Sequence, residues 1–137
     1  MNLNKEILVY GNELIPEDKL AIIIGQSLSQ DTEINNNFKI QLYASPDDVI
    51  KSSYEEIIVL DVAKGINDVM IIKNLENLKH DKIYSSHDLN LGIYLKIFQN
   101  MKAIHNKKFW IIAIPYDWYD KIDLAQNKVK SILKELI

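Results

Sequence analysis

Apolar runs and amphipathic stretches alternate along this chain. Short apolar runs bounded by polar residues or glycine predict strands, and longer stretches with apolar residues every three or four positions predict helices. The predicted strands cover residues 7–10, 38–43, 56–61, 68–73 and 109–114, and the predicted helices cover residues 16–28, 45–52, 88–102 and 122–136. This alternation predicts an α/β fold, a three-layer α/β/α sandwich around a mostly parallel sheet.

Local signals give some of the element boundaries. Acidic residues after Pro16 suit the first turn of a helix, and Ser45 followed by Pro46 suits a helix start. The polar segment 31–37 predicts a surface loop. Strand 68–73 follows strand 56–61 too closely for a crossover helix, so we expect it to be an antiparallel edge strand. The expected five-stranded sheet has the order 2-1-3-5-4, with strand 4 at that edge.

The chain has 137 residues, which is room for a single domain spanning residues 1–137. It contains no cysteine, so thiolate nucleophiles, disulfides and cysteine metal sites are excluded. Its 16 basic residues are all lysine and its net charge is −3, which argues against a nucleic-acid partner. No apolar run is long enough to span a membrane, and the first residues do not resemble a secretory signal. We therefore expect a soluble cytoplasmic protein.

Three polar residues fall where an open α/β sheet binds ligands, at the carboxyl ends of its strands. Asp18 follows the first strand, Asp61 ends the strand 56–61, and His87 directly precedes the helix 88–102. If the topology is as predicted, all three lie at one edge of the sheet. Two carboxylates and an imidazole form a donor set that suits nickel, zinc or ferrous iron.

Each of these residues also has a structural explanation. Asp18 can favour the helix dipole, Asp61 can cap a turn after its strand, and His87 can cap the helix that follows. For Asp18 or His87 taken alone, the structural role is the more common one. Their shared edge is what favours a functional site.

Four motifs in this chain resemble those of the maturation proteases of nickel–iron hydrogenases. Residues 11–18, GNELIPED, resemble that family's opening motif G-N-x-L-x-x-D-[DE]. The apolar strand that ends in Asp61 is similar to the second motif, and Ser86-His87-Asp88-Leu89 is similar to the third, S-H-x-L. The strand 111–115 and the long last helix match the family's ending. The motifs occur in the family's order over almost the whole chain.

The resemblance implies an endopeptidase that removes the C-terminal extension from the nickel-loaded precursor of a [NiFe] hydrogenase large subunit. That precursor is then the partner, and its own nickel is the metal recognised, with zinc or cadmium as substitutes in crystals. The family's metal-contacting and catalytic residues fall on Asp18, Asp61 and His87. Substrate contacts are expected from the residues Gly11, Asn12, Tyr43, Ser45 and Tyr116.

The chain departs from the family pattern at three places. Val9 replaces the first glycine of G-x-G-N, and Lys19-Leu20-Ala21 replaces a G-x-G. Residues 43–46, Tyr-Ala-Ser-Pro, stand where a loop with glycine and threonine normally follows the second strand. A glycine loop gives a substrate backbone close access, so this last change bears on how the substrate is held.

Two hypotheses about the reaction and two other functions stay open at this point. A metal can polarise the scissile carbonyl or activate a water, and Asp18 or Asp61 can instead take the proton of that water. The protein can also be a non-catalytic factor that binds the precursor, or a receiver-like signalling domain phosphorylated on Asp61. Tyr116, Trp118 and Tyr119 follow the last strand, where they can line a peptide site or pack the final helix.

Overall fold

The computed structural model describes residues 3–11, 19–45, 47–72 and 107–137. Its strands are β1 (Lys5–Val9), β2 (Lys39–Gln41), β3 (Glu56–Ala63), β4 (Met70–Ile72) and β5 (Lys108–Pro115). Its helices are α1 (Lys19–Gln30), α2 (Thr32–Asn37), α3 (Asp48–Lys51), the 3-10 helix η1 (Trp118–Asp120) and α6 (Ile122–Glu135). The predicted helix 88–102 and the predicted helix start at Pro16 lie outside the described residues.

The five strands form one sheet in the order β2-β1-β3-β5-β4. Strands β2, β1, β3 and β5 run parallel, and β4 pairs antiparallel with β5, with Ile71 opposite Ile112. The predicted fold class, strand order and antiparallel edge are confirmed. Since the parallel strands point the same way, their carboxyl ends share one edge of the sheet, which we call the carboxyl edge.

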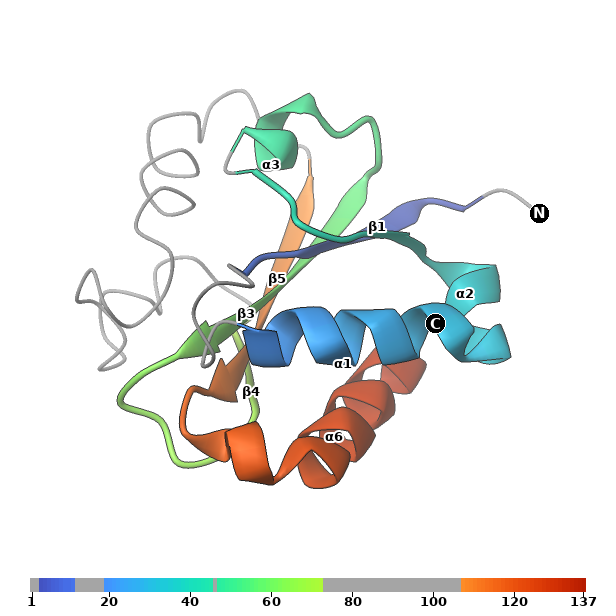
Figure 1. The fold of residues 1–137 in the computed structure, drawn as a ribbon. Helices are drawn as coiled ribbons and strands as arrows, with labels where there is room; N and C mark the ends of the chain where they lie inside the picture. The colour runs from blue at the N-terminus through green and yellow to red at the C-terminus, as the bar shows by residue number, and fades with distance from the viewer. Residues whose placement is uncertain (1–2, 12–18, 46, 73–106) are drawn as a thin grey trace.

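Helices flank both faces of the sheet (Figure 1), with α1 and α6 side by side on one face and α3 on the other. Because side chains alternate along a strand, β3 supplies both cores. Ile58 and Leu60 belong to the core under α1 and α6, whereas Ile57 and Val59 belong to the core on the α3 side. All four side chains are buried, as expected for a central parallel strand.

The prediction of a loop at residues 31–37 is wrong, because most of this segment forms the helix α2. Asp31 caps this helix by accepting a hydrogen bond from the Ile34 amide at 3.1 Å. Ile34 is fully buried and ties the helix to the core. With a single apolar anchor, the segment has no periodic pattern from which a helix could be predicted.

Several predicted boundaries also differ from the structure, and three of them lie near the carboxyl edge. β2 ends at Gln41, two residues before the predicted end at Tyr43, whose backbone is left-handed. Ser45 is not the cap of α3, since that helix begins at Asp48 and its cap position is Asp47. Asp61 does not end β3, because Val62 and Ala63 continue the ladder with β5.

Within the described ranges, none of the helices has the length and hydrophobicity that crossing a membrane requires.

Candidate functional site at the carboxyl edge

Asp61 lies near the end of β3, in the middle of the carboxyl edge. Its neighbours across the sheet are Ala113 on β5 and Tyr10, which follows β1 and donates its amide to the Leu60 carbonyl at 2.9 Å. Asp61 is only 4% exposed. Among the described residues, Asp61 and Glu6 are the two acidic residues that are buried. A buried carboxylate is costly unless it is bound to something, so this position is a candidate for function.

The side chain of Asp61 projects from the α3 side of the sheet. It alternates with Leu60 and Val62, which belong to the core under α1 and α6, and it shares its face with Val59 and Ala63. The next side chain along this face of β3 is a methyl group, Ala63, and the one opposite on β5 is also a methyl group, Ala113. No bulky side chain therefore occupies these two positions beside the carboxylate.

One oxygen of this carboxylate is held by the backbone. The Val62 amide donates a hydrogen bond to Asp61 Oδ1 at 2.8 Å. Such a contact fixes the orientation of the carboxylate. Asp61 therefore supplies an oriented oxygen donor, as a hard ligand or a proton acceptor requires.

Tyr10 is a residue of this site that the sequence reasoning missed. It is almost completely buried, and its hydroxyl donates a hydrogen bond to the Ser45 carbonyl at 2.9 Å. Burial raises the pKa of its phenol well above 10.0, and the negative charges of Asp48 and Asp61 raise this pKa further. The phenol therefore stays protonated and keeps its bond to Ser45 at any physiological pH.

The loop after β2 reaches the same edge. Tyr43 has a φ of 56°, a left-handed conformation that costs a residue with a side chain about 1–2 kcal/mol. The Ala44 amide donates to the Val9 carbonyl at 2.9 Å, and the Ser45 amide donates to Asp48 Oδ2 at 2.6 Å. Tyr43 and Ser45 are exposed, so this loop presents both predicted substrate residues at the surface.

On the other side of β3, the predicted substrate residue Tyr116 follows β5. Its amide donates to the Ala63 carbonyl at 3.0 Å, and its ring lies 5.1 Å from Lys64 Nζ. Tyr116 and Tyr119 are exposed, whereas Trp118 is buried in the core with α6. Each of the two interpretations therefore applies to a different part of this aromatic group. Trp118 packs against the final helix, and Tyr116 and Tyr119 are exposed where a peptide substrate could contact them.

Gly11, the first residue of the opening motif, is described and partly exposed directly after Tyr10. Asn12, Asp18 and His87 lie outside the described residues, so the predicted convergence of Asp18, Asp61 and His87 stays a prediction. Within the described part of the chain, no three acidic or histidine side chains are grouped to hold a metal ion.

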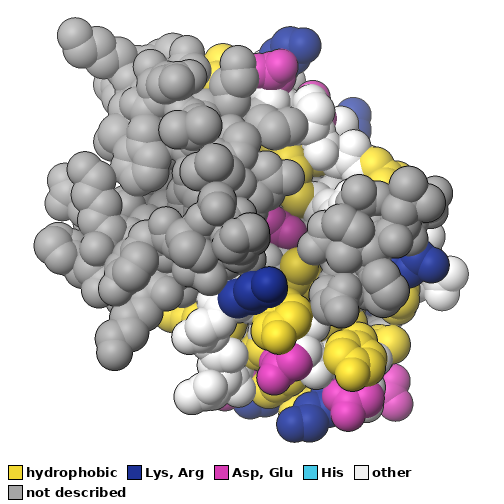
Figure 2. Space-filling model, turned by 60° about the vertical axis from the view of Figure 1, so that its left-hand side comes forward, with side chains coloured by type: hydrophobic (Ala, Val, Ile, Leu, Met, Phe, Trp, Pro, Cys, Tyr) yellow, Lys and Arg dark blue, Asp and Glu magenta, His cyan; other side chains and the backbone are white. Residues whose placement is uncertain are grey.

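Figure 2 shows a face of the molecule on which hydrophobic, acidic and basic side chains lie close together.

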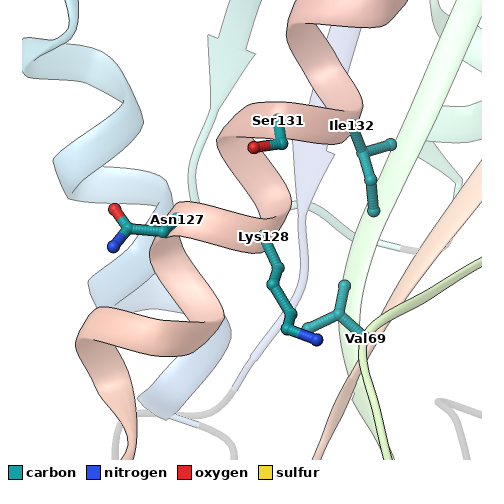
Figure 3. A pocket seen from close by; sticks show the side chains of 5 residues that line it. All are labelled: Val69, Asn127, Lys128, Ser131 and Ile132. Carbon is teal, nitrogen blue, oxygen red and sulfur yellow. The ribbon is translucent and has the colours of Figure 1, made fainter.

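A separate hollow of about 320 Å³ lies between α6 and Val69. Figure 3 shows Lys128 and Ile132 on the side of α6 toward Val69, whereas Asn127 points away. Val69 and Ile132 pack on the core under α1 and α6, so this hollow belongs to the face of the sheet opposite Asp61. The described residues that line it include no carboxylate or imidazole, and the hollow is not part of the candidate site.

Comparison with known proteins gives matches among solved structures alone. No protein-family model matches this sequence, and no curated protein is significantly similar to it. A [NiFe] hydrogenase maturation protease HybD from Thermococcus kodakarensis superimposes with a TM-score of 0.68 at 16% identity, covering 98% of this chain and 99% of that one. The hydrogenase maturating endopeptidase HybD from E. coli gives 0.66 at 16% identity, covering 97% and 93%. The [NiFe] hydrogenase maturation protease HycI from Thermococcus kodakarensis KOD1 gives 0.62 at 13% identity, covering 96% and 90%. Over almost its whole length, this chain therefore has the fold of the [NiFe] hydrogenase maturation proteases.

Proposed function

We propose that this protein is an endopeptidase that removes the C-terminal extension of a nickel-loaded [NiFe] hydrogenase large-subunit precursor. Its fold is that of hydrogenase maturation endopeptidases, and its motifs resemble theirs in the same order. The observation that carries the proposal is the buried, oriented carboxylate of Asp61 at the carboxyl edge.

The chemistry of the proposed donor set suits nickel that arrives with the substrate. Asp61, together with Asp18 and His87, offers oxygen and nitrogen donors, and the chain has no cysteine to supply softer ligands. The thiolates that nickel favours would then come from the precursor. Such a division lets the enzyme recognise a precursor only when its metal is in place.

Asp61 has two roles in this proposal. Its carboxylate contacts the metal that the precursor carries, and either Asp61 or Asp18 accepts the proton of the attacking water. The alanines beside Asp61 on β3 and β5 support the proposal, because larger side chains there would hinder the approach of a substrate.

The sheet argues against the receiver-like alternative. Receiver domains have the doubly wound parallel order 2-1-3-4-5, whereas this sheet has the order 2-1-3-5-4 with an antiparallel edge strand. Asp61 is also 4% exposed and is followed by two more strand residues, which is a poor position for a phosphate acceptor.

The test uses the purified nickel-loaded precursor and follows loss of its extension by mass spectrometry. Asp61→Asn keeps the side chain's shape and removes its charge, so we expect processing to fall by about 100-fold or more. The matched control is Asp68→Asn, which removes an exposed carboxylate that pairs with Lys128 on the opposite face. Asp68→Asn should process the precursor like the wild type.

The same experiment distinguishes the proposed endopeptidase from a non-catalytic factor that only binds the precursor. A wild-type protein that captures the precursor without shortening it would be a binding factor, and the proposed cleavage would be wrong. Equal processing by wild type and Asp61→Asn would instead remove Asp61 from the reaction.

A further inference from the structure

Glu6 is a buried acid to which the proposed reaction gives no role. It is 5% exposed and lies near the start of β1, away from the carboxyl edge. None of the described residues forms an ion pair with it, and Lys39, its neighbour on β2, places Nζ 6.0 Å from the centre of the Tyr54 ring instead. A buried carboxylate without a cation is costly, and an apolar side chain of similar size is often at least as stable. Stability therefore does not explain a glutamate at this position.

A short hydrogen bond joins Glu6 to the end of α3. The Ser52 hydroxyl donates to Glu6 Oε1 at 2.6 Å, a distance typical of a hydroxyl bound to a charged carboxylate. Ser52 is the C-cap residue of α3, and its amide closes the helix by donating to the Asp48 carbonyl at 3.0 Å. The Ser52 carbonyl also accepts a bond from the side chain of Lys107. The end of α3 is thus fixed to β1 through the side chain of Glu6.

Helix α3 depends on such contacts for its position. It has four residues, and a helix this short is not stable without contacts to the rest of the protein. Val49 is its buried residue and packs on the α3 side of the sheet. At its first residue, Asp48 Oδ2 accepts bonds from the Ser45 amide at 2.6 Å and from Gln41 Nε2 at 3.0 Å. A shift of the end of α3 would therefore also move the groups that Asp48 holds.

The groups that Asp48 holds lie beside the candidate site. The Ser45 carbonyl accepts the bond from the Tyr10 hydroxyl at 2.9 Å, and Tyr10 lies next to Asp61 across the sheet. Glu6 and Tyr10 project from the same face of the sheet, four residues and about 13 Å apart along the chain. Helix α3 is therefore bound at both of its ends to one short segment of chain, at Glu6 and, through Ser45, at Tyr10.

We propose that Glu6 is a positioning residue for the proposed reaction. Its bond to Ser52 fixes α3, and α3 in turn holds Asp48 and Ser45 against Tyr10 beside the buried carboxylate of Asp61. The buried charge of Glu6 is retained for this geometry and not for stability. The inference rests on the proposed function and adds to it a residue that lies away from the carboxyl edge.

The test measures kcat and KM for processing of the nickel-loaded precursor, together with the midpoint of urea unfolding. Glu6→Leu removes the acceptor and fills its space, Glu6→Gln keeps an acceptor oxygen, and Ser52→Ala removes the donor. Val129→Ala is the control, because it opens a cavity in the core on the opposite face of the sheet. All assays are run at a temperature at which every variant is folded.

We expect Glu6→Leu to unfold at a urea concentration equal to or above that of the wild type, while its kcat/KM falls about tenfold or more. Glu6→Gln should keep kcat/KM within about twofold of the wild type, because it still accepts the Ser52 bond. Val129→Ala should unfold at a lower urea concentration and process the precursor like the wild type. Lower processing in Glu6→Leu then does not come from instability.

The double variant Glu6→Leu/Ser52→Ala tests whether the two residues act through their shared bond. Since each single substitution removes the same bond, we expect the double variant to process the precursor no more slowly than Glu6→Leu alone. A loss equal to the product of the two single losses would overturn the inference, because the residues would then act independently. Ser52→Ala keeps the test decisive if Glu6→Leu does not fold.

Wild-type kcat/KM in Glu6→Leu or in Ser52→Ala would overturn the inference and leave the proposed function intact. Equal losses in Glu6→Gln and Glu6→Leu would also overturn it, because the charge, and not the bond to Ser52, would then matter. A Glu6→Leu variant that unfolds at a lower urea concentration than Val129→Ala would show that Glu6 serves stability, contrary to the inference. A wild-type protein that does not shorten the precursor would overturn both the inference and the proposed function.

Discussion

Tyr10 and Asp61 lie side by side on one face of the sheet, on neighbouring chain segments that the bond from the Tyr10 amide to the Leu60 carbonyl holds in register at 2.9 Å. Tyr10 extends from this pair to the Ser45 carbonyl. Tyr10 thus lies between the buried carboxylate and the loop after β2, because its backbone pairs beside Asp61 and its phenol bonds to that loop. This connection relates the candidate chemistry to the candidate substrate contacts.

Replacing Tyr10 with phenylalanine should loosen that connection. The variant loses the bond to Ser45 and keeps the ring, so we expect a loss of about 1 kcal/mol in the free energy of unfolding. Processing of the precursor should also fall, because only the bond from the Ala44 amide to the Val9 carbonyl then holds the loop at 43–45 against β1. Urea unfolding and the processing assay measure the two effects. A variant with wild-type values in both would show that the bond does not position the loop.

The pH dependence of the same variant gives a second check. The pKa of Tyr10 is raised above 10.0 in the folded protein, so its stabilising contribution is complete below that pH and is lost as the pH rises further. The wild type should therefore lose stability faster than Tyr10→Phe above pH 10. Parallel stability curves for the two proteins in alkaline solution would contradict this.

Asp31 should make the protein sensitive to acid. The Ile34 amide, and then the charges of Lys134 and Lys130, lower the pKa of Asp31 below 3.8, so its contribution is present above that value and is lost as the pH falls further. Asp31→Ala should lose about 1 kcal/mol at pH 7 through the missing helix cap. Asp31→Asn keeps a capping oxygen, so it should lose less at pH 7 and show a flatter decline in acid. Urea unfolding between pH 7 and pH 2.5 tests both expectations.

At Gly25, the backbone of α1 approaches the side chains of Val9 and Leu42 closely. A Cβ at this position would lie 2.8 Å from Leu42 Cδ2 and 3.0 Å from both methyl groups of Val9. Gly25→Ala should therefore destabilise the protein by about 1–3 kcal/mol, although alanine favours a helix. Gln26→Ala, at an exposed neighbouring position, should change stability by no more than about 0.5 kcal/mol. A stabilised Gly25→Ala variant would show that the helix can shift away at little cost.

Much of the fold could be predicted because its strands are strongly apolar. The run 57–60 is buried on both faces, and its pattern alone identified the centre of the sheet. Helix α2 could not be predicted, because it depends on one buried residue, Ile34, and one capping bond from Asp31. Its stability comes from contacts made only in the folded chain.

The candidate site was predictable in position but not in detail. The carboxyl-end rule located Asp61, but the sheet face on which it lies depends on strand register, which also brings Tyr10 beside it. The left-handed conformation of Tyr43 could not be predicted, since its residue type disfavours it and bonds from distant residues enforce it. Properties that depend on register or long-range bonds need the structure.

The most direct test of the central claim is a crystal structure of the protein soaked with nickel or cadmium. The proposal predicts a single ion at the carboxyl edge, bound by Asp61 together with Asp18 and His87. An ion bound elsewhere, or carboxylate and imidazole groups too far apart to share one ion, would contradict the account.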